Sequence, residues 1–435
     1  MMRFVRFSRS MESIAFEAPV LSYVGNAFLP SIAVVPLQQN TGKPSQPVVA
    51  VGERVREGQL LARGTPPDSV NIHAPIPGIL KEFSAIPLPN GAMGNAAIIQ
   101  LSGSFDILGR RTENFPWKSI SESEILRVLE DKGVINTFDK PCPFVPELRK
   151  ARKMGKATLA IRLFDADPTC QLEDALVASS LETILIGTSL IAKACEASDV
   201  YLIHSGKKWP GPADKKLEEF FASRQSHRIR ASSRYPSGND GLIRSLVASS
   251  TKKPLGELIC IDAVTAISAY DAIVHNQPVV SRTIVVTGTA LGRPEILTVR
   301  IGTPIGDGIA ECGGFKNPPE RIVVNGLLTG TAVYDLDTPI TKYTKSLHIM
   351  DSDACPGYTV TQCVHCGRCL QVCPVKIDPM RVVIGIDKSK HAPELLNSLK
   401  KCKQCGCCAI VCPSRIPLHH RIREANVRLN KGSVQ

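Results

Sequence analysis

A cysteine pattern that occurs twice near the C-terminus constrains this chain more than any other feature. The pattern is C-x₂-C-x₂-C-x₃-C-P, and it occupies residues 363–374 and again residues 402–413. Three thiolates with this spacing on a tight loop can reach three irons of one cubane, and proline after the fourth cysteine ends the run and turns the chain. The duplicated run therefore predicts two [4Fe–4S] clusters close to each other.

The fourth cysteine of each run is expected to bind the cluster of the other run, as in two-cluster ferredoxins. This rule gives the first cluster the thiolates of Cys363, Cys366, Cys369 and Cys412. It gives the second cluster the thiolates of Cys402, Cys405, Cys408 and Cys373. One further cysteine, Cys407, fits no ligand position and is expected to be a small buried residue, and His365 is expected to be a loop residue.

Zinc and disulfides are the alternatives for so many cysteines. Zinc sites usually show two C-x₂-C pairs separated by a longer loop, without the proline-marked fourth cysteine seen here. Nine of the 15 cysteines lie between Cys363 and Cys412, and Glu12 and Glu17 fall where a signal peptide needs its apolar stretch. A cytoplasmic protein with such clustering is expected to bind metal rather than to form disulfides.

Positive charge is concentrated around the cysteine runs. The formal net charge is +12, and residues 340–435 hold 15 Lys and Arg against 6 Asp and Glu. Two oxidised clusters with their thiolates remove roughly four of these charges, which leaves a domain suited to an acidic redox partner or an anionic membrane surface. The alternative is an ordinary solvated basic face. Lys400, Lys401 and Lys403 flank the second run and are candidates for docking.

Hydropathy argues against a membrane span. No run approaches the roughly 18 uninterrupted apolar residues that a spanning helix needs. The longest candidate, residues 183–195, is too short and contains polar side chains. We therefore expect a chain that stays in the cytoplasm and does not span the bilayer.

Three further units are expected before the cysteine runs. Residues 20–103 show V-G-x-x-V-x-x-G-Q-x-L followed by A-P-x-x-G, which resembles the barrel-sandwich hybrid of biotinyl and lipoyl carriers, although the stretch 67–71 has no modifiable lysine. In residues 117–275, strand-like and helical runs alternate, which predicts a Rossmann-like α/β layer. Residues 280–351 are strand-rich and predict a small β-grasp domain. Residues 355–430 then form the helical two-cluster domain.

With these features together, the chain resembles the RnfC (RsxC) family, whose members are the peripheral C subunits of ion-translocating Rnf electron-transport complexes. The resemblance covers roughly residues 20–430. It is most specific in the segments P-L-Q-Q (36–39), H-A-P (73–75), I-G-T-P (301–304), G-G-F (313–315), D-T-P-I-T-K (337–342) and C-P-S-R-I-P-L (412–418). It implies a barrel-sandwich hybrid, an α/β domain like the flavin subunit of respiratory complex I, an SLBB-like β-grasp domain and a two-cluster ferredoxin-like domain, in that order.

The family resemblance also implies an NADH and FMN site, but the sequence departs from the family there. The family's glycine loop, G-x-G-G-A-G-F-P-T, holds phosphates through bare backbone amides. The matching stretch, residues 133–146, keeps only Gly133 and contains three prolines, which lack the amide hydrogen and restrict φ. The family's next two acids are shortened to Asp165 and Asp167, and the ring of Phe164 is expected to invade the flavin's space. The alternative is that this register is shifted and the phosphate site lies elsewhere.

We therefore expect a degenerate flavin and NADH region around Gly133, Asp165 and Asp167, with no bound FMN and no catalytic residue. The preferred function is that of the electron-transferring C subunit of an Rnf-type complex on the cytoplasmic face of the inner membrane. Its expected partners are the membrane subunits and an acidic ferredoxin or flavodoxin, and no nucleic acid. The alternatives are a soluble cobalamin-reductase-like iron–sulfur protein and a structural adaptor whose clusters stabilise the fold.

Overall fold

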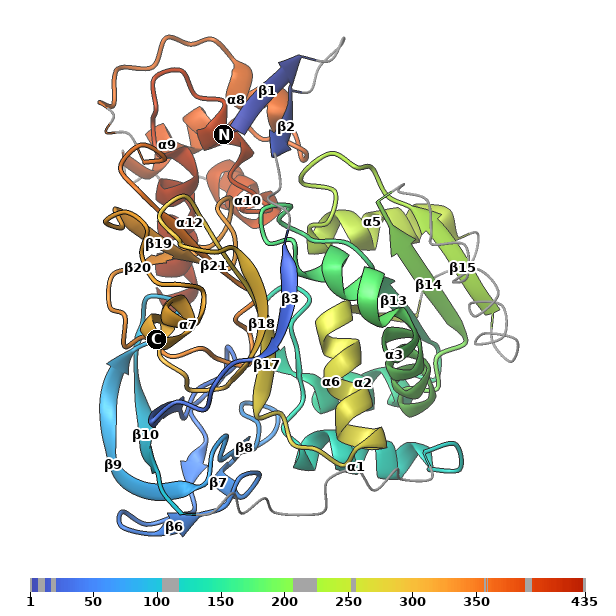
Figure 1. Ribbon diagram of the computed structural model, residues 1–435. Coiled ribbons are helices and arrows are strands. Elements are labelled where there is room, and N and C mark those ends of the chain that lie inside the picture. Colours follow the sequence, from blue (N-terminus) through green and yellow to red (C-terminus); the bar gives the residue numbers. More distant parts are fainter. Residues whose placement is uncertain are drawn as a thin grey trace.

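The computed structural model describes residues 2–6, 12–16, 21–103, 117–205, 225–251, 256–355, 357, 359–387 and 393–432. Figure 1 shows three sheet-containing parts, with the helical C-terminal part packed at one end of the molecule. The N-terminal strands β1 (Met2–Arg6) and β2 (Glu12–Phe16) pair as an antiparallel hairpin.

Two small antiparallel sheets form the barrel-sandwich hybrid. One sheet has the order β4 (Ile32–Pro36), β10 (Met93–Leu101), β9 (Gly78–Pro87) and β6 (Arg54–Val55). The other has the order β5 (Gln46–Pro47), β7 (Leu60–Arg63) and β8 (Ile72–His73). Apolar side chains from both sheets, such as Val35, Leu61 and Ile99, meet in one buried core. This shared core stabilises the two short sheets, because a single two-stranded hairpin is only marginally stable in water.

A parallel four-stranded sheet forms the centre of the α/β domain. Its order is β15 (Gln225–Arg230), β14 (Asp199–His204), β13 (Ala157–Arg162) and β16 (Glu257–Asp262). Four helices cover one face: α1 (Glu122–Asp131), α2 (Phe144–Lys153), α3 (Leu172–Ala194) and α6 (Ala263–Val274). Helix α5 (Asp240–Ser250) covers the other. Because both faces are covered, the central strand β13 is buried along its whole length, as parallel sheets require.

Helix α3 is long and apolar enough to cross a membrane by length and composition, which the hydropathy of the sequence did not predict. Its C-terminal half packs against α6 in the core of the α/β domain, where Ile184, Leu185 and Ile191 are buried. At Gly187 the two helices come so close that a Cβ atom would lie 2.0 Å from the carbonyl oxygen of Ala266. Packing inside the α/β domain therefore accounts for the apolar side chains of α3.

A mixed six-stranded sheet forms the SLBB-type β-grasp domain. Its order is β20 (Thr331–Val333), β19 (Arg321–Val324), β21 (Ser346–Met350), β17 (Ser281–Thr287), β18 (Glu295–Arg300) and β3 (Ser22–Asn26), and helix α7 (Ile305–Glu311) packs on it. Strand β3 falls in the range expected for the barrel, yet it pairs with β18 in parallel. Without β3, strand β18 would be an exposed edge with unpaired backbone groups.

The C-terminal domain consists of short helices and the two cysteine runs. The helices are α8 (Arg368–Val372), α9 (Pro379–Asp387), α10 (Pro393–Lys401), α11 (Cys407–Ile410) and α12 (Leu418–Gly432). A small apolar core of Val383, Leu399, Leu418 and Ile422 holds α9, α10 and α12 together, and five of the cysteines pack against it. The cysteines are therefore placed by helix packing on one side and by loops on the other.

Candidate metal centre and adjoining cavity

The two cysteine runs have the same backbone conformation at matching positions 39 residues apart. His365 and Gln404 have φ of 53° and 50°, and Gly367 and Gly406 have φ of 72° and 76°. In each run the first of these residues donates its amide to the sulfur of the first cysteine, at 3.4 Å in both cases. Backbone amides that point at sulfur are what an iron–sulfur cluster needs around it. The glycines then begin α8 and α11.

One cysteine from the first run and four from the second line a small common cavity: Cys373, Cys402, Cys405, Cys407 and Cys408. The walls are largely apolar and include Ile377 and Ile422. All of these cysteines except Cys407 form the donor set predicted for the second cluster, and four thiols in an apolar surround fit a [4Fe–4S] group. Among the described residues, no group of His, Cys, Asp and Glu is close enough together to hold a single metal ion. A [4Fe–4S] cubane does not need such closeness, because each of its four irons binds a different thiolate.

The ends of the two runs are also joined on the side of the first cluster. The amide of Thr361 donates to the carbonyl of Ser414, and the Ser414 hydroxyl donates to the carbonyl of Gln362. These bonds bring the chain just after Cys412 to the chain just before Cys363. This contact is consistent with the proposal that Cys412 of the second run binds the first cluster, as Cys373 of the first run is proposed to bind the second. As expected, Cys407 is buried and His365 is exposed.

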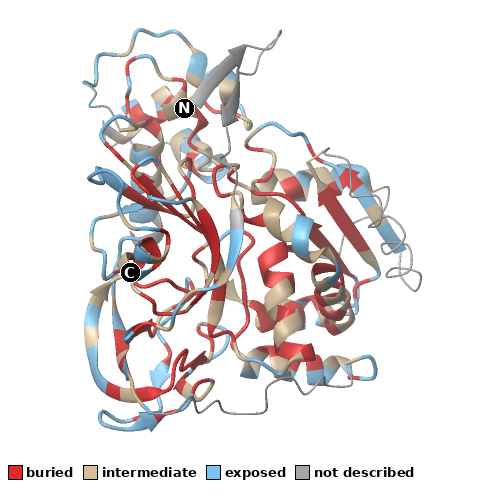
Figure 2. Ribbon diagram, viewed as in Figure 1, coloured by how far each residue is buried: buried red, intermediate tan, exposed pale blue. Residues whose placement is uncertain are grey.

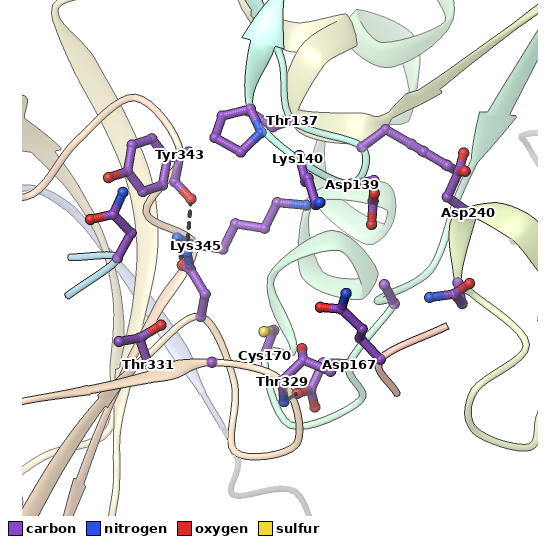
Figure 3. Close-up of a pocket in the computed structure, with 18 of the residues that line it drawn as sticks. Thr137, Asp139, Lys140, Asp167, Cys170, Asp240, Thr329, Thr331, Tyr343 and Lys345 are labelled. Carbon is purple, nitrogen blue, oxygen red and sulfur yellow. Dashed lines mark hydrogen bonds between the residues drawn. The ribbon is translucent and has the colours of Figure 1, made fainter. Parts of the chain in front are cut away.

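A cavity of about 770 Å³ adjoins the second run. Figure 3 shows Thr137, Asp139 and Lys140 of the α/β domain facing Tyr343 and Lys345 of the β-grasp domain across it. Three residues of the C-terminal domain, Lys403, Gln404 and His419, line both this cavity and the small thiol-lined one. Gln38 and Asn90 of the barrel line it as well, so the large cavity lies where all four domains meet and ends against the predicted second cluster.

Asp165 and Asp167 line the large cavity, but hydrogen bonds within the protein hold both carboxylates. Asp165 accepts the amides of Glu173 and Asp174 at the start of α3, each at 3.1 Å. Asp167 accepts the amide and hydroxyl of Thr169 and the amide of Leu328 in the β-grasp domain. Burial raises the pKa of both acids, to about 8 for Asp165, where Glu173 adds to the effect. The contacts make Asp165 a helix cap and Asp167 a link between domains.

Gly133 lies away from Asp165 and Asp167, which corrects the grouping expected from the sequence. It follows helix α1 with φ of 68°, and its amide donates to the carbonyl of Glu130 as in a helix C-terminal cap. A Cβ atom there would lie 2.1 Å from the carbonyl oxygen of Asn71 in the barrel. Glycine is therefore required at 133 by a helix end and a close domain contact, and Gly133 does not line the large cavity.

Arg162 occupies the interior where the family sequence has an Asn-Gly pair. Its side chain is 1% exposed, and it donates to Glu173 at 3.0 Å and to the carbonyl of Gly238 at 2.9 Å. Its guanidinium also lies 4.4 Å from the centre of the Phe138 ring. The ring of Phe164, expected to invade the flavin's space, instead packs in the apolar cluster beside Tyr201. Arg162 therefore lines the large cavity, whereas Phe164 does not.

Two backbone amides in the stretch that matches the family's glycine loop are engaged within the domain. Thr137 donates its amide to the Thr265 hydroxyl at 3.0 Å, and Phe138 donates its amide to the Asn136 side chain at 3.1 Å. Pro141 has no amide hydrogen to offer. Phosphate binding by such a loop depends on free, convergent amides. These two amides are therefore not available to a phosphate group.

A buried network of four charges stands beside the cavity, and the sequence motifs did not reveal it. Lys345 donates to Glu173 and to Asp262, each at 2.7 Å, and Glu173 also pairs with Arg162. Lys345 and Arg162 hold the pKa of Asp262 well below its usual range despite the opposing effect of burial. The detectable signal was Asp262, the last residue of the strand β16 and the N-cap of α6.

Comparison with known protein families agrees with this architecture. Residues 21–104 match the RnfC barrel sandwich hybrid domain, residues 283–332 match the SLBB domain, and residues 362–416 match the 4Fe-4S dicluster domain. The dicluster match confirms the predicted [4Fe–4S] clusters, and the three matches occur in the predicted order.

Individual relatives extend the similarity over most of the chain. The C subunit of the ion-translocating oxidoreductase complex of Rhodobacter capsulatus is 27% identical over 387 residues, which cover 86% of this chain and 72% of that protein. The C subunit of the proton-translocating ferredoxin:NAD(+) oxidoreductase complex of Clostridium ljungdahlii is 25% identical over 363 residues, covering 82% and 79%.

A solved structure shows the same fold at low identity. A crystal structure of an NAD+-reducing [NiFe]-hydrogenase matches with a TM-score of 0.52 and 15% identity, over 74% of this chain and 67% of the hydrogenase chain. This likeness concerns the fold alone, and it confirms the predicted complex-I-like multidomain architecture.

Proposed function

This chain belongs to the RnfC family, and we propose that it is the electron-transferring C subunit of an Rnf-type ion-translocating oxidoreductase complex. The observation that carries the proposal is the repeated cysteine run, folded twice with the same left-handed turns and with Cys373 placed among the thiols of the other run. When bound, two [4Fe–4S] clusters supply one-electron carriers that need no proton or bond change at the protein. The electron is passed on by the chain, and no catalytic residue is required.

Residues of the α/β domain hold the second cysteine run in place and shield it. The Tyr235 hydroxyl donates to the carbonyl of Cys405, and the Asn239 side chain donates to the carbonyl of Lys403 at 3.1 Å. Both contacts fix the second run against the α/β domain. Hydrogen bonds around the ligands and exclusion of water set the potential of a cluster as much as its ligands do. The α/β domain thus serves as a support for the second cluster in this proposal.

We further propose that the chain works without the NADH and FMN chemistry of its family. The engaged amides of Thr137 and Phe138 and the buried Arg162 support this, because they occupy the place of a phosphate cradle. Electrons then come from another carrier or from a neighbouring subunit. The expected attachment is peripheral, on the cytoplasmic face of the inner membrane, with the membrane subunits as partners and an acidic ferredoxin or flavodoxin as a candidate carrier.

Analysis of the anaerobically purified full-length protein tests this function. We expect about eight irons and eight sulfides per chain, no stoichiometric flavin, and reduction of the clusters by dithionite but no rapid reduction by NADH. An iron content near four, or zinc in place of iron, would contradict the cluster assignment. Stoichiometric flavin together with rapid reduction by NADH would contradict the loss of the nucleotide site while leaving the clusters intact.

A further inference from the structure

The two cysteine runs share their backbone conformation but differ in what covers them. Val364 and Arg368 in the first run correspond to Lys403 and Cys407 in the second, because the runs are offset by 39 residues. In the second run Cys407 is 3% exposed, whereas Arg368 in the first is exposed to solvent. The second run is therefore covered by the rest of the protein, whereas the first run is open to solvent.

Residues of the other domains cover the second run. Besides the bonds from Tyr235 and Asn239, the carbonyl oxygen of Leu328 in the β-grasp domain lies 2.9 Å from where a Cβ of Gly406 would stand. In the part of the chain that the structure describes, residues 363–372 make no hydrogen bond to the α/β or β-grasp domain. Figure 2 shows the segment leading into α8 mostly in the colour of exposed residues.

The uncovered face has an apolar centre next to the first-cluster cysteines. Val364 follows Cys363 and is 65% exposed, and Leu370 follows Cys369 and is 40% exposed. Cys366 itself is exposed. Apolar side chains directly beside an electron carrier, left open to water, are typical of a surface that another protein covers.

The rim of this face is positively charged. Arg368, Lys376 and Arg381 are exposed. The described stretch 359–387 contains two acids, Asp378 and Asp387, and the carboxylate of Asp378 accepts the amides of Met380 and Arg381 at the start of α9. With that carboxylate engaged locally, the rim favours a partner whose own rim is acidic.

We infer that a redox subunit of the same complex docks on this face, which we call the first-run face and define by Val364, Arg368 and Leu370. The inference rests on the proposed function, and it adds which surface of the C-terminal domain exchanges electrons with another subunit. A cluster held by Cys363, Cys366, Cys369 and Cys412 would exchange one electron with the partner's redox centre in each encounter, one being oxidised as the other is reduced, and no bond would form or break. The partner would cover the first run as the α/β domain covers the second.

The test uses the full-length chain in its native membrane complex. The variant V364D/L370D places two charges in the apolar centre, and V51D is the matched control, because Val51 is 60% exposed on a turn of the barrel. After detergent solubilisation, we expect the variant to recover the other subunits at least 10-fold less than wild type, while V51D recovers them normally. Iron and sulfide content should be unchanged in both, which shows that the cluster domain still folds.

A photo-crosslinking residue at position 364, with one at position 51 as control, identifies the partner. We expect the crosslinked peptide from position 364 to come from a subunit with its own flavin or iron–sulfur centre and an acidic contact surface. Normal recovery with V364D/L370D, or crosslinks only to a subunit without a redox centre, would overturn the inference. If binding is instead lost on reversing Lys400 and Lys401 alone, the docking surface lies at α10 and the inference is also wrong. Failure of the proposed function would look different from failure of this inference. In that case the wild-type protein itself would lack eight irons or would recover no other subunits.

Discussion

The ammonium group of Lys342 lies 2.7 Å from the carbonyl oxygen of Gly133, and it donates to that oxygen from a fully buried position. It also donates to the carbonyl of Asn71 at 2.8 Å, while the Lys342 amide donates to the Gln39 side chain at 3.0 Å. Gln39 and Asn71 belong to the barrel, Gly133 to the α/β domain and Lys342 to the β-grasp domain. One lysine therefore joins three domains through neutral partners only.

This arrangement predicts a pH-dependent stability. Burial, with a smaller effect of the nearby Arg282, lowers the pKa of Lys342 from 10.5 to about 7. The unfolded chain keeps this proton up to about pH 10.5, so between pH 7 and 10 the unfolded state binds more protons than the folded state. The free energy of unfolding should therefore rise with pH in this window, by up to about 1.4 kcal/mol per pH unit.

Urea unfolding of wild type, K342M and K81M at several pH values checks this prediction. Lys81 is exposed on β9 and serves as the control. Other groups near Lys342 are His73, Lys132 and Arg282, and all remain in K342M. We expect the rise with pH to flatten in K342M and to persist in K81M. An equal slope in all three proteins would show that Lys342 keeps an ordinary pKa in the folded state.

Crossed ligation predicts which thiols each cysteine substitution exposes. C412A removes a ligand that the second run contributes to the first cluster, so Cys363, Cys366 and Cys369 should become alkylated while Cys402 stays protected by its own cluster. Iron should fall from about eight to about four per chain. Alkylation under anaerobic conditions followed by peptide mass analysis measures this.

C407A is the matched control for C412A, because Cys407 lies in the same run but matches no ligand position. It should keep all its iron. If C412A instead exposes Cys402, Cys405 and Cys408, each run holds its own cluster and the crossed assignment is wrong.

The buried charge network predicts a large cost for removing one partner. In E173Q, Arg162 and Lys345 both lose their shared carboxylate in a site with almost no solvent. Breaking a buried pair in this way typically costs about 3–5 kcal/mol. The exposed pair of Arg149 and Glu130 offers the comparison, and R149M should cost less than about 1 kcal/mol. Similar losses in both variants, measured by urea unfolding, would show that the network is not desolvated as the structure indicates.

Local patterns were enough to predict an α/β domain and a pair of [4Fe–4S] clusters. The alternation of strand-like and helical runs over residues 117–275 predicted the domain that contains β13, β14 and β16, because each strand lies in the buried parallel sheet. The pairing of β3 with β18 could not be predicted, since it joins segments about 270 residues apart and depends on an otherwise open sheet edge. The contact of Gly133 with the barrel was missed for a different reason: a glycine that ends a helix and a glycine of a phosphate loop look alike in one sequence.

The last prediction concerns nucleotide binding, where this chain departs most from its family. A cavity of about 770 Å³ remains beside the second run, so space alone does not exclude a ligand. The amides of Thr137 and Phe138, in the stretch that matches the glycine loop, already donate to Thr265 and Asn136 and are not free to bind phosphate. Burial and the neighbouring Asp240 raise the pKa of Asp139, whereas Lys140, Arg162 and Arg244 lower it. A phosphate in the same place would also lose its hydration on burial.

We therefore expect FMN and NADH to bind the cluster-loaded protein more weakly than about 10 μM, or roughly −7 kcal/mol. Quenching of flavin fluorescence and a direct calorimetric titration with NADH measure the two affinities. D139N tests the physical reason, because removing the carboxylate should improve binding of any phosphate ligand only modestly if the missing amides are the main defect. Tight binding of either ligand to wild type would show that the cavity holds phosphate by groups other than the stretch that matches the glycine loop. An increase of 100-fold or more in D139N would place the defect in one charge rather than in the backbone.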